Sequence, residues 1–230
     1  MAAEPSAASP AKPQKVWDGP TRLFHWLLVG LVAFSWWTAE EHLMTLHKAS
    51  GLTIVGLVVF RIYWGFMGPD TARFTSFIKG PRAILSYASS LFKPAHQLAF
   101  GHNPLGALSV AAIILALVVQ VSLGLFAMDT DGLESGPLAR FVSYDMAETA
   151  GDLHEDAFNI LLVLIGLHIA AIAFYLIVKR ANLVGPMITG RRAHGGAGPE
   201  AGLATVPLWR FILGVVIAGG VVGLVILAGG

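Results

Sequence analysis

Five long apolar runs constrain the fold of this chain more than any other feature of its sequence. They cover residues 23–39, 49–67, 103–126, 153–178 and 207–228 of 230. A helix that crosses a membrane needs about 20 mostly apolar residues, with a lower limit of about 17. All five runs reach that length, the first one only just. The sequence therefore predicts an all-α membrane protein with five transmembrane helices.

The composition supports a lipid environment and narrows the chemistry. Charged residues make up 13% of the chain, whereas soluble domains average about 25%. The chain contains no cysteine, which excludes disulfides, zinc–thiolate sites and cysteine-ligated iron–sulfur clusters. Its eight histidines are left as the nitrogen ligands for a metal. The net charge of +1 gives no reason to expect a nucleic-acid partner.

The segments outside the apolar runs are predicted to form a tail, a surface helix and a linker. Residues 1–15 are rich in Ala, Pro and Ser and are expected to form a disordered tail. Residues 81–93 have an apolar face and a polar face, which predicts a helix lying on the membrane surface. We expect 191–206 to be a linker. Helix starts are indicated at Asn103-Pro104, at Pro207, and at Asp152 followed by Glu155, which resembles a capping box.

The placement of the charges predicts the orientation in the membrane. Thirteen of the fifteen Lys and Arg residues lie in the tail, in the 68–102 and 179–206 segments and at the adjoining helix ends. The other side has ten of the fourteen acids and two bases, Lys48 and Arg140. Basic residues favour the cytoplasmic side. We therefore expect a multi-pass protein of the bacterial inner membrane, with a cytoplasmic N-terminus and a periplasmic C-terminus.

Four histidines fall at matching depths. His154 and His168 share one run and are 14 residues apart, which places them on nearly the same helix face about 21 Å apart along the axis. The depths then pair His25 with His168 near the cytoplasm and His47 with His154 near the periplasm. His102 competes for the inner position. The remaining three, His42, His96 and His194, are expected to be solvated loop residues.

Two histidines at each of two depths suit two stacked cofactors in a helix bundle. Haem b is the natural candidate, because iron held by two imidazoles suits electron transfer. Zinc would require three or four converging ligands. The alternative is that these histidines form hydrogen bonds between helices and bind nothing.

Four segments, taken in order, resemble a known family. They are VWDGPTRLFHWLL from Val16, HKASGLTIVGLVVFRIYWGFMGPDTARF from His47, GHNPLGALSV from Gly101 and HEDAFNILLVLIGLH from His154. Over roughly residues 16–190 the chain is similar to bacterial cytochrome b561, a family that includes the cytochrome b subunits of nickel–iron hydrogenases. The resemblance implies a four-helix core with two b-type haems, one near each membrane surface. It implies that His25 and His168 ligate the inner haem and that His47 and His154 ligate the outer one, leaving residues 207–230 as an accessory helix.

Several further residues are candidates for supporting roles. Haem propionates attract basic groups, so Arg22, Arg61 and Arg73 are candidates at the inner haem and Lys48 at the outer one. The positive-inside rule explains these arginines equally well. His102, Arg73 and the 81–93 helix surround the expected quinone position. Gly51, Gly56 and Gly166 would let a porphyrin approach the backbone, or serve helix packing.

The function implied by the resemblance is electron transfer between a periplasmic redox partner and membrane quinone. The partner would be a c-type cytochrome or a hydrogenase, and the acidic 127–156 loop would attract a basic protein. An alternative is a stand-alone oxidoreductase acting on a small periplasmic species such as superoxide or a metal ion. A non-redox scaffold or transporter would leave the paired histidines unexplained.

Overall fold

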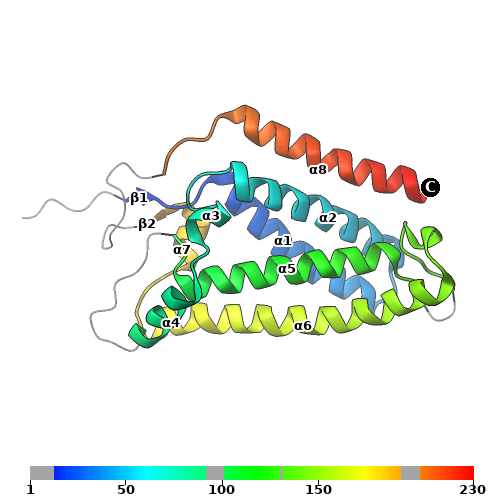
Figure 1. Ribbon diagram of the computed structural model, residues 1–230, viewed down its shortest axis with the longest axis horizontal. Coiled ribbons are helices and arrows are strands. Elements are labelled where there is room, and N and C mark those ends of the chain that lie inside the picture. The colour runs from blue at the N-terminus through cyan, green and yellow to red at the C-terminus, as the bar shows by residue number, and fades with distance from the viewer. Residues whose placement is uncertain (1–12, 92–100, 130–131, 193–202) are drawn as a thin grey trace, which may run out of the picture.

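Long helices running side by side make up most of the protein (Figure 1). The computed structural model describes residues 13–91, 101–129, 132–192 and 203–230. The longer helices are α1 (Gly19–Glu40), α2 (Met44–Met67), α5 (Pro104–Phe126), α6 (Tyr144–Ile177) and α8 (Leu208–Gly229). The shorter elements are β1 (Gln14–Lys15), α3 (Phe74–Phe77), α4 (Pro81–Ser90), the 3₁₀ helix η1 (Ala139–Phe141), α7 (Val184–Thr189) and β2 (Arg191–Arg192).

Four of these helices are long and apolar enough to cross a membrane: α2, α5, α6 and α8. Helix α1 has 22 residues, so it is long enough, but its hydropathy falls short of the other four because Arg22 and His25 interrupt its first turns. It lies along α2 (Figure 1). We call the end of the bundle where α1 begins the proximal end, and the opposite end the distal end.

Two helical hairpins form the core. The backbones of α1 and α2 approach closely, as do those of α5 and α6, and the closest approach between the hairpins is made by α2 and α5. An apolar layer at mid-height joins all four helices, with Ile54, Val58, Leu117 and Leu161 buried at its centre. Side chains of α1 complete this layer. Between helices in a membrane, such a layer stabilises the bundle through close van der Waals packing.

Helix α8 lies outside the two hairpins and packs on α2 (Figure 1). Its Ala218 is buried against Phe60 and Trp64 of α2. Gly214 makes this approach possible, because a Cβ there would lie 2.7 Å from the Tyr63 ring. The expected accessory helix therefore contacts the core along one edge.

The helix starts differ from expectation at one place. Asn103 caps α5 as predicted, its side chain accepting a hydrogen bond of 2.8 Å from the Gly106 amide. The capping box predicted at Asp152 is wrong. Helix α6 begins nine residues earlier, at Tyr144, where the Ser143 hydroxyl accepts a hydrogen bond from the Met146 amide. Polar residues 144–152 extend the helix beyond its apolar run, which hydropathy alone does not detect.

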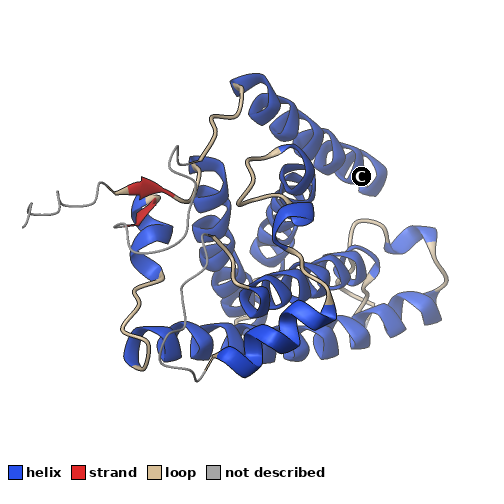
Figure 2. Cartoon of the chain, turned by 60° about the vertical axis from the view of Figure 1, so that its left-hand side comes forward, coloured by secondary structure: helices blue, strands red, loops and turns tan. Residues whose placement is uncertain are grey.

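The proximal end is closed by segments from both ends of the core. Strands β1 and β2 pair antiparallel, Gln14 with Arg192 and Lys15 with Arg191 (Figure 2). Residues 14 and 15 are therefore paired, unlike the disordered tail expected for 1–15, and residues 1–12 lie outside the described part. Helix α4 covers most of the surface helix expected at 81–93 and is tied to α6 by a 2.7 Å bond between the Tyr87 and Tyr175 hydroxyls.

Candidate functional site

Two of the predicted histidines face one another at the distal end. The ring centroids of His47 on α2 and His154 on α6 lie 6.2 Å apart, with the ring planes at 88°. One metal ion bridging two imidazoles, with bonds of about 2.0–2.1 Å, places their centroids roughly 6 Å apart. The spacing of this pair therefore suits a single ion held between them.

Both rings of the distal pair are oriented through the same nitrogen. The Nδ1 of His47 lies 2.9 Å from the Ser35 carbonyl oxygen, and the Nδ1 of His154 lies 2.9 Å from the Gln120 carbonyl oxygen. A carbonyl accepts only, so each Nδ1 carries the proton and donates it. Each Nε2 is then left with a lone pair, the form in which imidazole binds a metal.

Two residues of α5 shape the position of His154. A Cβ at Gly124 would lie 2.7 Å from the His154 Cε1, so glycine lets this ring rest against α5. The Gln120 side-chain amide lies 3.2 Å from the His154 Nε2. Sequence reasoning missed both residues. The available signal was Gln120, a polar residue within an apolar run.

The proximal histidines His25 and His168 come from α1 and α6 and are near enough to interact electrostatically. The His168 Nδ1 lies 3.5 Å from the Ser109 hydroxyl. The His25 ring packs edge-on against Trp26 at 4.9 Å, and within the described chain its buried Nδ1 has no hydrogen-bond partner. The distal rings of His47 and His154 therefore face each other, while His25 and His168 lie within electrostatic range of one another.

His102 lies beside this proximal pair in an aromatic setting. Its ring centroid is 4.7 Å from that of Trp17 and 4.6 Å from that of Phe77, and it bonds to the Thr71 backbone. Burial lowers the pKa of His102 to about 3, and the positive charge of Arg61 acts in the same direction. The ring is therefore neutral at physiological pH.

A buried polar network surrounds Arg61 at the proximal end. Arg61 donates to the Ala72 carbonyl oxygen at 3.2 Å and lies 4.9 Å above the Phe74 ring. Asp18 accepts a 2.8 Å hydrogen bond from the Trp64 indole. One guanidinium nitrogen of Arg61 and one carboxylate oxygen of Asp18 are buried with no partner among the described residues. Such orphaned atoms need a partner from outside the chain or from water.

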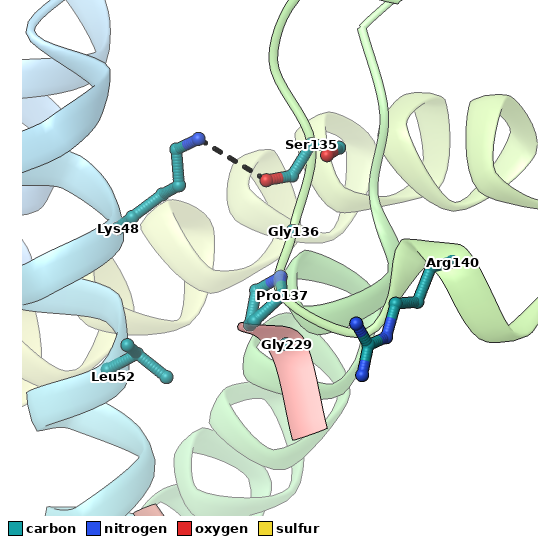
Figure 3. Close-up of a pocket in the computed structure, with 7 residues that line it drawn as sticks. All are labelled: Lys48, Leu52, Ser135, Gly136, Pro137, Arg140 and Gly229. Carbon is teal, nitrogen blue, oxygen red and sulfur yellow. Dashed lines mark hydrogen bonds between the residues drawn. The ribbon is translucent and has the colours of Figure 1, made fainter. Parts of the chain in front are cut away.

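The other basic candidates are already engaged. Arg22 donates to the Ile188 carbonyl oxygen, and Trp26 donates to the Met187 carbonyl oxygen at 3.2 Å. Arg73 forms an exposed ion pair with Asp70. Lys48 pairs with Glu134 at 2.5 Å and donates to the Ser135 carbonyl oxygen at 3.3 Å (Figure 3). These contacts turn it toward residues 132–138, which we call the distal loop.

The three glycines singled out in the sequence divide into two groups. A Cβ at Gly51 or at Gly166 would have no neighbour within 4 Å, so both leave room beside their helices. A Cβ at Gly56 would lie 3.3 Å from Val222 of α8, so this glycine serves helix packing. Of the loop histidines, His42 is exposed in the turn between α1 and α2, while His96 and His194 lie outside the described residues.

Within the described residues, the side chains that could bind a metal come together in pairs and not in larger groups. Across the ranges that the structure describes, three or more His, Cys, Asp or Glu side chains do not converge anywhere. A zinc site of three or four ligands is therefore not formed by these residues. Two opposed imidazoles are the donor set that a haem iron would take, so His47 and His154 would be able to hold such a group.

A family model described as prokaryotic cytochrome b561 matches residues 16–190. The chain belongs to the prokaryotic cytochrome b561 family. The match includes every helix from α1 to α7 and ends before α8. Membership of this family implies haem b and transmembrane electron transfer. Comparison with curated proteins and with solved structures gives no match.

Proposed function

We propose that this cytochrome b561 binds two haems b, one at each end of its four-helix core, and carries electrons across the membrane between a partner at the distal end and quinone at the proximal end. The observation that carries the proposal is the opposed distal pair, His47 and His154. His25 and His168 would be the corresponding proximal ligands. Iron with two imidazole ligands supplies one-electron chemistry without an open position for bond-making reactions.

The residues of the chain have distinct tasks in this proposal. The carbonyls of Ser35 and Gln120 hold the distal imidazoles in the tautomer whose Nε2 carries a lone pair. At His154 the iron would take the place of the Gln120 side-chain amide, which lies 3.2 Å from that nitrogen. At the proximal end, the orphaned nitrogen of Arg61 is suited to receive an anionic propionate. Arg22 also keeps one buried guanidinium nitrogen without a partner in the described residues. Lys48, expected at the outer haem, is instead turned to the distal loop by Glu134 and the Ser135 carbonyl oxygen.

Quinone would bind near the proximal pair, beside His102. This ring is neutral, so it would act as a hydrogen-bonding group and not as a cation. Arg73 lies at the start of α3 and is held by Asp70, so it would contribute charge at the rim of the site. The support for this position is the group of polar side chains at one end of the apolar bundle.

The distal partner would be a basic protein. Eight acids and one base occupy residues 127–156, and Glu134 among them pairs with Lys48. A negative surface steers a positively charged partner toward the distal histidine pair. A c-type cytochrome or a hydrogenase would supply this partner.

The decisive experiment measures haem bound per chain. We expect two haems in the purified wild-type protein and one in His154→Ala or in His168→Ala, with the reduced spectrum of the remaining site retained. His42→Ala, which removes the exposed histidine of the α1–α2 turn, is the control and should keep both. Two haems in either ligand variant would contradict the assignment.

The quinone position is tested separately. We expect His102→Leu to slow quinone reduction at least tenfold while both haems remain bound, because the hydrogen-bonding group would be lost. His102→Gln, which keeps a donor and an acceptor, should recover part of the rate. Unchanged kinetics in His102→Leu would remove His102 from the site without affecting the haem assignment.

A further inference from the structure

A pocket of about 280 Å³ opens at the distal end, with no histidine in its lining. Lys48 and Leu52 of α2 form one wall, Gly136 and Pro137 of the distal loop form another, and Gly229 at the end of α8 closes it (Figure 3). Ser135 and Arg140 complete the lining. In Figure 3, Lys48 and Arg140 lie on opposite sides of Pro137 and Gly229.

Two basic residues at this end of the molecule line this pocket. Segments 40–48 and 127–156 contain ten acids and two bases, Lys48 and Arg140. Both bases line the same pocket, although they are 92 positions apart in the chain and come from different elements. Where basic residues are otherwise scarce, two that meet in one cavity mark a site for an anion.

Both bases retain donors for such an anion. Arg140 lies 5.1 Å from the Phe141 ring centroid, and no carboxylate in the described ranges pairs with it. Lys48 has three donors, of which Glu134 and the Ser135 carbonyl oxygen occupy two. The guanidinium is therefore the principal recognition group, and the ammonium supports it with its third donor.

The depth of the pocket in the membrane indicates where the anion would come from. Lys48 lies in the second turn of α2, and Gly229 is the last residue of α8. Both helices are apolar enough to cross a membrane, so their ends lie at the depth of lipid headgroups. A basic pocket at that depth offers charge-assisted hydrogen bonds to a phosphate headgroup.

We propose that this pocket binds a phosphoryl anion, with the headgroup of an anionic phospholipid as its source. Arg140 forms the main contact, Lys48 the second, and the apolar sides of Leu52 and Pro137 accompany the lipid toward the chains. The headgroup would thereby join α2, the distal loop and α8, which already meet there through the Lys48–Glu134 ion pair and through Gly229 against Pro137.

The test uses a reporter thiol in the pocket of the intact, haem-loaded protein. Because the chain has no cysteine, Leu52→Cys introduces a single thiol whose reaction rate with a maleimide reports whether the pocket is filled. The probes are dioleoyl phosphatidylglycerol, dioleoylglycerol with the same tails and no phosphate, and inorganic phosphate. Each probe is tested on Leu52→Cys alone and on Leu52→Cys combined with Arg140→Gln or with Arg191→Gln. Arg191→Gln is the matched control, because it removes an exposed arginine at the proximal end.

We expect phosphatidylglycerol to slow the reaction and dioleoylglycerol to leave it unchanged. Arg140→Gln should raise the protecting concentration about tenfold, the scale of one charge-assisted hydrogen bond, and Arg191→Gln should not. Protection by inorganic phosphate with the same dependence on Arg140 would support the phosphoryl site with free phosphate as its source. Equal protection by both lipids, or protection insensitive to Arg140→Gln, would overturn the proposal.

Discussion

At the scale of single residues, the distal site depends on contacts that hold His154 from α5. The ring is oriented by the Gln120 carbonyl oxygen at 2.9 Å and rests against Gly124. A metal-binding histidine whose other nitrogen donates to a carbonyl has a defined tautomer and direction. The position of α5 relative to α6 therefore determines whether the Nε2 of His154 faces His47.

Gly124→Ala tests this dependence. The added Cβ would lie 2.7 Å from the His154 Cε1, so the ring or the helix must move, at a cost of about 1–3 kcal/mol. We expect the purified variant to lose the distal haem and bind one haem per chain, measured by haem extraction and the reduced spectrum. Gly219→Ala, where a Cβ has no neighbour within 4 Å, should keep two. An unaltered spectrum in Gly124→Ala would refute the argument.

His102 gives a second prediction at this scale, on pH. Its pKa is lowered from 6.5 to about 3 by burial, so below pH 6.5 the unfolded chain takes up a proton that the folded chain does not. The contribution of His102 to the free energy of unfolding is therefore fully present above pH 6.5. It is lost as the pH drops toward 3, by at most about 1.4 kcal/mol per pH unit.

The comparison of variants isolates this contribution. We expect the Tm in detergent to fall less steeply between pH 7 and pH 5 in His102→Gln than in the wild type. His42→Gln, which replaces an exposed histidine, should retain the wild-type slope. If the three slopes coincide, His102 does not remain neutral in the folded protein.

At the scale of elements, α8 is separable from the haem-binding core. It contacts α2 through Gly214, Ala218 and Phe211, and its Gly229 lies against Pro137 of the distal loop. The four proposed ligands lie on α1, α2 and α6. The family match likewise ends before this helix. Displacing α8 should therefore leave both histidine pairs intact.

Gly214→Val tests that separation. The larger side chain would collide with Tyr63, which lies 2.7 Å from the position of a Cβ, and the misfit is expected to cost about 1–3 kcal/mol. We expect faster proteolysis of the segment before α8, with two haems still bound per chain. Gly220→Val, a position with no neighbour within 4 Å, is the control. Loss of haem from Gly214→Val alone would show that α8 supports the core.

At the scale of the whole molecule, the arrangement agrees with an odd number of crossings. The beginning of α1 and the end of α8 lie at opposite ends of the bundle (Figure 1). The asymmetry of basic residues then predicts a cytoplasmic proximal end and a periplasmic distal end. Of the five predicted spans, α1 has the weakest hydropathy signal, and its first turns carry Arg22 and His25.

Single cysteines in the cysteine-free chain test this orientation. In cells whose outer membrane has been removed and whose inner membrane is sealed, we expect a membrane-impermeant maleimide to label Glu148→Cys on the distal side. Arg191→Cys, at the proximal end, should react only after the membrane is opened. Labelling of both in intact cells would contradict the five-span arrangement, and the reverse pattern would contradict its direction.

Much of this architecture follows from local sequence properties. Apolar length predicts the long helices because a membrane leaves the backbone few alternatives. The 14-residue interval between His154 and His168 places them on one helix face, and helix direction then assigns His25 and His47 to their depths. The start of α6 was missed because residues 144–152 are polar and helical, so their helicity carries no hydropathy signal.

The tertiary structure alone decided how the histidines are held and which cations remain available. Nothing in the sequence shows that Ser35 and Gln120 carbonyls orient the distal rings, that Gly124 makes room for His154, or that aromatic rings enclose His102. Lys48 is next to His47 in sequence, yet its side chain turns to Glu134 and to the pocket that it shares with Arg140. Periodicity and length are properties of one helix, whereas hydrogen bonds, close approaches and charge pairs arise between helices, and these depend on how the chain packs.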